Sequence, residues 1–128
     1  MNSTYNSITL VAAEAISEFS VVALDTAGKA ALPSAATDDG IIGVAQRTVS
    51  AGDPVEVLVY GITRVKASGA ITFATTPILQ AESDGEVSAC VSGSYPIARV
   101  LPNVNQLSTA GAGEQFFAFF LGSFTPLA

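Results

Sequence analysis

The chain has 128 residues, with eleven acidic and five basic side chains and a net charge of −6. This length fits one domain with a sizeable core, and a hydrophobic content of 49% argues against disorder. The acidic balance disfavours nucleic-acid binding, which needs clustered Lys and Arg. Without His and with Cys90 as its only cysteine, the sequence excludes Cys/His zinc sites, His-based catalytic triads and internal disulfides.

The first residues are polar and carry no targeting signal. Residues 1–7 lack the basic and apolar regions of a signal peptide. The apolar run 116–121 is far shorter than the ~20 residues that span a bilayer. We therefore expect a soluble protein made in the cytosol, with no membrane partner. Residues 1–10 form either a frayed end or an extended N-terminal arm that adds a strand to a neighbour's sheet.

Residues 11–128 are predicted to form a single all-β domain. Runs rich in Val, Ile, Leu and Thr alternate with glycine and proline, which is typical of a compact β-barrel or sandwich of short antiparallel strands. Residues 12–19 are interpreted as strand and turn, with a short helical turn as the alternative. Gly28, Gly69 and Gly85 stand where tight hairpins need positive φ. The apolar runs cover residues 19–24, 40–45, 55–60, 62–66, 96–101 and 116–121.

Two parts of the chain, about residues 15–61 and 70–122, appear as pseudo-repeats of one β-unit. Four matches keep the same order with offsets of about 55 to 61 positions. They are Ala15-Ile16 with Ala70-Ile71, Gly28 with Gly85, Ile42-Gly43-Val44-Ala45 with Ile97-Ala98-Arg99-Val100, and residues 52–61 with 113–122. Two packed copies of a small β-unit would give a pseudo-symmetric barrel or sandwich.

Residues 55–66 alternate between an apolar face and a mixed face. Val55, Val57, Val59, Thr63 and Val65 share the face expected to point into the core. The mixed face is charged at its ends and apolar in the middle, and it is either a solvated surface or a partly covered one. Its residues are Glu56, Leu58, Tyr60, Ile62, Arg64 and Lys66.

Residues 116–121 carry aromatic side chains on both faces of one strand. Phe116 and Phe120 share one face with Ala118, and Phe117 and Phe119 share the other with Leu121. Burial of each aromatic side chain stabilises the fold by about 1.5–3 kcal/mol, so a solvent-exposed aromatic face would lose several kcal/mol of stability. Either a second sheet of the same chain covers the second face, or another subunit does.

Candidate groups for chemistry are few. Asp38-Asp39 and Glu82-Ser83-Asp84-Gly85-Glu86 are better explained as solvated turns than as cation sites, since neither has the ligand spacing of a calcium loop. Cys90 is expected on a strand, buried and inert. We therefore expect a protein that is not an enzyme and that uses no metal or cofactor. Arg47, Arg64 and Lys66 could form one local patch against an acidic partner.

The order of these motifs resembles the small capsid decoration (cement) proteins of tailed bacteriophages. The first half carries the resemblance in Ala15-Ile16, Val21-Val22-Ala23-Leu24-Asp25, Gly28-Lys29-Ala30, Ile42-Gly43-Val44-Ala45 and residues 51–57. Gly61 to Val65, Ala70-Ile71 and Arg99-Val100 continue the pattern, so the resemblance covers roughly residues 8–122.

The resemblance implies a structural virion protein, assembled in the host cytoplasm, that binds the outer surface of the capsid as a homotrimer. There it would reinforce contacts between subunits of the major capsid protein. We assign Leu58, Tyr60, Ile62, Phe117 and Phe119 to the trimer interface. Contacts with the capsid are assigned to Tyr5, Ile8, Arg64 and Lys66. The main alternative is a receptor-binding or adhesive β-module of a phage fibre.

Overall fold

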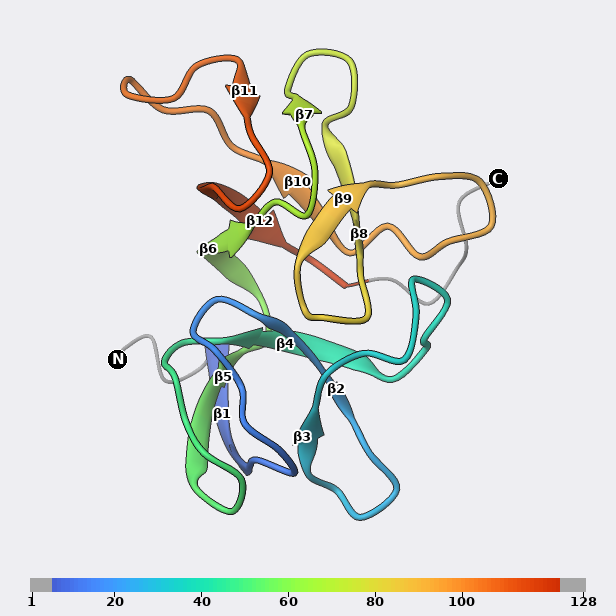
Figure 1. Ribbon diagram of the computed structural model, residues 1–128, viewed down its shortest axis with the longest axis vertical. Coiled ribbons are helices and arrows are strands. Elements are labelled where there is room, and N and C mark those ends of the chain that lie inside the picture. The colour runs from blue at the N-terminus through green and yellow to red at the C-terminus, as the bar shows by residue number, and fades with distance from the viewer. Residues whose placement is uncertain (1–5, 123–128) are drawn as a thin grey trace.

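The computed structural model describes residues 6–122 and is all-β, as predicted (Figure 1). It contains two five-stranded antiparallel sheets that lie one above the other along the long axis. The first sheet is built from β1 (Ser7–Val11), β2 (Val21–Leu24), β3 (Ala30–Ala31), β4 (Ile41–Ala45) and β5 (Pro54–Leu58). The second is built from β6 (Gly61–Lys66), β8 (Ile78–Ala81), β9 (Val87–Ala89), β10 (Ala98–Val100) and β12 (Gln115–Phe120).

A two-stranded ribbon of β7 (Ile71–Thr72) and β11 (Thr109–Ala110) extends from the second sheet. Among residues 6–122, no helix has the length and hydropathy needed to cross a membrane.

The two sheets have the same topology. Their strand orders are β1-β5-β4-β2-β3 and β6-β12-β10-β8-β9, so each strand of the first sheet has a counterpart in the second at the same place in the chain and in the sheet. The registers also correspond: Leu58 pairs with Val44 as Phe119 pairs with Arg99. The halves that correspond in strand order and register begin at β1 and β6, earlier than residues 15 and 70.

Equivalent turns carry equivalent hydrogen bonds. In the β2–β3 hairpin the N–H of Asp25 donates to the carbonyl of Lys29, and in the β8–β9 hairpin the N–H of Glu82 donates to the carbonyl of Glu86. Gly28 and Gly85 occupy the same position in these hairpins, with φ of 80° and 85°. A left-handed conformation of this kind strains any residue with a Cβ, so glycine at both positions has a common physical cause.

Each half encloses an apolar core between its own strands. The smaller cluster belongs to the first half and includes Ile16, Val22, Val55 and Val57. The larger cluster is formed mainly by residues 65–120, and its aromatic members include Phe73, Phe116 and Phe120. Val21 and Val44 of the first half complete this larger cluster, so one sheet packs against the core of the other.

Several boundaries differ from those predicted. Residues 7–10 are not part of an arm, because β1 pairs with β5 of the same chain; residues 1–5 lie outside the described residues. The alternating run 55–66 keeps its predicted buried face except at the half-buried Val59, and it divides into β5 and β6, which belong to different sheets. Gly61, with φ of 128°, begins β6 after this break. Phe19 precedes β2 with φ of 64°, and Gly69 lacks the positive φ expected of it.

Candidate functional site

The strongest candidate site is the face of β6, β12 and β10 that points away from the larger core, here called the outer face. On β6 the exposed positions Ile62 and Arg64 alternate with the buried Thr63 and Val65. On β12 the half-buried Phe117 and Phe119 alternate with buried residues in the same way. The predicted division of the aromatic strand into two faces is therefore confirmed.

Register brings the predicted residues of this face together. Phe119 lies opposite Ile62, and Phe117 lies opposite Arg64. The rings of Tyr60 and Phe119 meet edge to face with 5.3 Å between centroids. Cross-strand pairs of this kind are the units that stabilise a sheet surface. Tyr60 and Ile62 nevertheless remain 51% and 62% exposed, so the chain itself leaves much of the patch uncovered.

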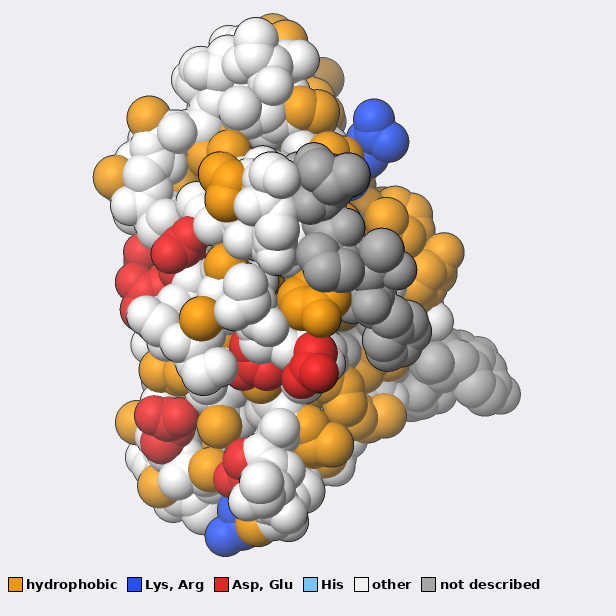
Figure 2. Space-filling model, turned by 90° about the vertical axis from the view of Figure 1, so that its right-hand side faces the viewer, with side chains coloured by type: hydrophobic (Ala, Val, Ile, Leu, Met, Phe, Trp, Pro, Cys, Tyr) orange, Lys and Arg blue, Asp and Glu red, His pale blue; other side chains and the backbone are white. Residues whose placement is uncertain are grey.

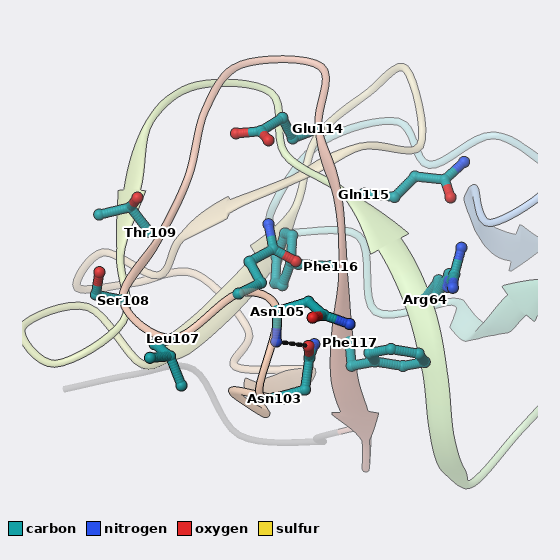
Figure 3. A pocket seen from close by; sticks show the side chains of 11 residues that line it. Arg64, Asn103, Asn105, Leu107, Ser108, Thr109, Glu114, Gln115, Phe116 and Phe117 are labelled. Carbon is teal, nitrogen blue, oxygen red and sulfur yellow. Dashed lines mark hydrogen bonds between the residues drawn. The ribbon is translucent and has the colours of Figure 1, made fainter.

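A cation stacks on one of these rings. The guanidinium carbon of Arg64 lies 5.0 Å from the ring centroid of Phe117, a geometry that attracts the cation to the aromatic face. Figure 3 shows the two side chains next to each other on neighbouring strands, beside a pocket that the loop residues Asn103 and Asn105 also line. The outer face thus joins apolar surface to a fixed positive charge.

The three strands of the outer face carry only basic charged side chains, although the protein as a whole is acidic and Glu114, directly before β12, lines the same pocket as Arg64. Arg64, Lys66 and Arg99 are three of the five cations, and β6, β10 and β12 contain no Asp or Glu. Lys66 lies close enough to Glu86, beside β9, to oppose the rise in the pKa of Glu86 that burial and Asp84 cause. On the face visible in Figure 2, acidic side chains lie in the middle and lower parts. The outer face is therefore suited to an acidic partner.

The remaining predicted site residues lie elsewhere. Leu58 packs against the larger core of its own chain, so its side chain is already used between the two halves. Ile8 is on β1 of the first sheet, apart from Arg64 and Lys66. Tyr5 lies outside the described residues.

The expected basic patch differs in one member. Arg47 belongs to the first half, where its guanidinium donates to the carbonyl of Pro54. Arg99 takes its place on the outer face, because β10 pairs with β12 and sets Arg99 opposite Phe119. The sequence analysis did not include Arg99 in the patch because it lies thirty-three positions beyond Lys66 in the chain. The repeat, which matches Arg99 with Val44, was the one sequence feature that related Arg99 to a position in the first half.

The surroundings of the acidic residues and of Cys90 do not indicate a metal site or a reactive thiol. Among residues 6–122, no cluster of three or more His, Cys, Asp or Glu side chains could hold a metal ion. Cys90 follows β9 rather than lying on a strand, and it is half-buried. Burial raises the pKa of its thiol, which disfavours the reactive thiolate.

Asp38 organises a turn. Partial burial raises the pKa of its carboxyl group, but hydrogen bonds from Ser34 and from the N–H of Gly40 outweigh this and leave the pKa lowered. A lowered pKa in the folded state means that the carboxylate stabilises the fold above its unfolded-state pKa, and that this stabilisation is lost as pH falls through the folded-state pKa.

We therefore expect Asp38→Ala to lower the free energy of unfolding by about 1 kcal/mol at pH 7. The difference from the wild type should shrink below about pH 4. Urea denaturation at a series of pH values measures both effects, with Asp39→Ala as the matched control. An Asp38 effect that stays constant down to pH 2.5 would contradict the assigned role.

The fold of the chain resembles that of a solved phage protein. The crystal structure of the head fiber gp8.5 N base of bacteriophage phi29 matches with a TM-score of 0.65 and 19% sequence identity. The match covers 95% of this chain and 97% of that one. No family model matches the sequence, and no curated protein does.

Because the match covers nearly all of both chains, the phi29 head fiber base has the same overall fold as this protein and not merely a shared part of it. At 19% identity the likeness concerns the fold, and individual residues do not transfer.

Proposed function

We propose that this chain is a structural protein of a phage virion that attaches to the outer surface of the capsid. It would be assembled in the host cytoplasm, bind the major capsid protein as a homotrimer and reinforce contacts between capsid subunits. The observation that carries the proposal is the exposed outer face, on which apolar and cationic side chains lie together. The likeness of the chain's fold to that of the phi29 head fiber base supports a role in the virion.

This role requires binding and no catalysis. A protein that strengthens a shell needs a rigid shape and a contact that is repeated many times, because linked weak contacts bind with high effective concentration. The outer face supplies apolar area at Ile62 and Phe119, and positive charge at Arg64 and Lys66. We assign the Arg64 and Lys66 end of the face to an acidic region of the capsid.

Removing the charge of Arg64 tests this assignment. We expect Arg64→Ala to weaken capsid binding about tenfold, equivalent to about 1.4 kcal/mol, because both the charge and its stacking on Phe117 are lost. Lys29→Ala removes a cation from the first half and serves as the control. Co-sedimentation with matching expanded capsids that lack the protein would give bound copies per capsid subunit.

Saturable binding at a fixed ratio, weakened by Arg64→Ala and not by Lys29→Ala, would support the proposal. Equal binding by the three proteins would remove Arg64 from the contact. A folded wild-type chain that does not bind its matching capsid would overturn the capsid role. A receptor-binding or adhesive module of a fibre would then be the better function, in agreement with the name of the phi29 protein.

A further inference from the structure

The duplicated fold leaves one of two equivalent surfaces uncovered. Val21, Val44 and Leu58 lie side by side across β2, β4 and β5 and are called the first row. Ile78, Arg99 and Phe119 lie side by side at the equivalent positions of β8, β10 and β12 and are called the second row. Both rows face away from the core of their own half.

The second half covers the first row. Val21 and Val44 are completely buried in the larger cluster, and Leu58 packs against it. Polar contacts fix this arrangement: the N–H of Val21 donates to the carbonyl of Gly85, and the side-chain amide of Gln46 donates to Thr63. The first half therefore seats its row on the side of the second half that presents Thr63 and the Gly85 hairpin.

The second row has no such cover among the described residues. Arg99 is exposed, and Ile78 and Phe119 are only half-buried. The charged side chain of Arg99 stands where the first row has the buried Val44. When two equivalent units pack head to tail, the contact uses a different surface of each unit. One row, and one surface that would receive a row, therefore remain uncovered.

The side of the second half that holds the first row is called its receiving side, and the equivalent side of the first half is exposed. Thr63 is 5% exposed, whereas its counterpart Ile8 is 38% exposed. Ala81 is 1% exposed, whereas its counterpart Leu24 is 45% exposed. A Cβ on Gly85 would lie 2.8 Å from Ser20, so the first half packs tightly there.

The counterpart of Gly85 has free space around it. A Cβ on Gly28 would meet no atom within 4 Å. Near this hairpin, Leu24, Ile42 and Val59 line one side of an apolar groove, and Phe120, Leu121 and Gly122 of the second half line the other. The first half thus presents an exposed apolar surface where the second half is covered.

Charge favours contact between these two open surfaces. Residues 6–60 contain seven acidic and two basic side chains, a net charge of −5. Residues 61–122 contain four acidic and three basic side chains, a net charge of −1, and the three cations lie on the outer face. Arg99 in the second row of one copy would therefore meet the acidic half of another.

We propose that copies of this chain associate head to tail, with the second row of one copy seated on the Ile8–Leu24 side of the next. The contact repeats between chains the packing that joins the two halves within a chain. This inference rests on the self-association in the proposed function and gives it a geometry. A heterologous contact closes into a ring when its rotation permits, and a homotrimer is such a ring.

Two complementary variants test the geometry. Phe119→Asp places a charge in the second row and should abolish self-association; Leu24→Asp does the same on the receiving side. Each variant alone is expected to sediment as a monomer. Mixed together they should form a one-to-one dimer, because the intact row of the Leu24 variant can still bind the intact receiving side of the Phe119 variant.

Sedimentation velocity of each protein and of the mixture gives the readout, with circular dichroism as a check on folding. Val104→Asp, at an 87% exposed apolar residue that belongs neither to the second row nor to the Ile8–Leu24 side, is the matched control and should assemble like the wild type. Arg99→Glu and Ile8→Asp form a second pair if the first unfolds. These residues are exposed, so their substitution disturbs no core.

Three outcomes would overturn the proposal. The wild type could stay monomeric up to about 100 μM, a concentration at which a contact of micromolar affinity is filled. Leu24→Asp and Ile8→Asp could both assemble normally while the row variants do not, which would mean that the outer face pairs with itself. The mixture of monomers could fail to dimerise. Capsid co-sedimentation is independent of these results, so a chain that assembles without binding capsids would separate this inference from the proposed function.

Discussion

Replacing Phe116 by alanine is expected to lower the free energy of unfolding by about 3–5 kcal/mol. Phe116 is 2% exposed and lies in the larger core, where its ring contacts Phe73 with 5.7 Å between centroids. Truncation removes the apolar contacts and leaves a cavity that the sheet on each side cannot fill, because β12 is held between β6 and β10.

The adjacent residue gives a matched control for this prediction. Phe117 lies on the opposite face of β12 and is half-buried, so Phe117→Ala should cost only about 1 kcal/mol. Thermal unfolding followed by circular dichroism compares them, and Phe116→Ala should reduce the Tm by about 10–20 °C. Similar losses for the two variants would show that both faces of β12 are core within the monomer.

Adding a single methyl group at Gly43 is expected to cost about 3 kcal/mol. A Cβ at this position would lie 2.3 Å from the carbonyl oxygen of Leu58 and 2.6 Å from Cγ1 of Val57. Most of the obstruction is the backbone of β5, which cannot rotate away as a flexible side chain could. Gly43→Ala therefore requires β4 and β5 to separate.

Gly69→Ala is the control for Gly43→Ala. A Cβ on Gly69 would meet nothing within 4 Å, and alanine there should change stability by no more than about 1 kcal/mol. Urea denaturation curves of the two variants provide the comparison. Ala98, the counterpart of Gly43 in the second half, carries a Cβ at the equivalent position and is 4% exposed. A neutral Gly43→Ala would show that β5 can move without loss.

Local patterns in the sequence determined the strands and their buried faces. Alternation along residues 55–66 assigned five residues to the interior. Four of them, Val55, Val57, Thr63 and Val65, are buried, and Val59, in the break between β5 and β6, is half-buried. Phe116 and Phe120 are buried as well. Such predictions succeed because successive side chains of a strand point to opposite faces, whatever lies beyond them.

The repeat could also be detected from short motifs. Gly28 matches Gly85 because each hairpin needs a residue with positive φ at this position. This requirement is local to the hairpin, so a short motif reveals it. The start of each half was placed too late, since the first strands, β1 and β6, share no rare residue: Ile8 stands where Thr63 does.

Only the tertiary structure decided which surfaces are covered. Leu58 and Phe119 occupy equivalent positions, but Leu58 packs against the other half of its chain and Phe119 does not. Pairing of β10 with β12 likewise placed Arg99 beside Phe119, although the two residues lie twenty positions apart in the chain. The sequence by itself thus determined an all-β, internally repeated chain with an aromatic strand. The packing of one half on the other decided which face is left open, because burial depends on contacts between residues far apart in the chain.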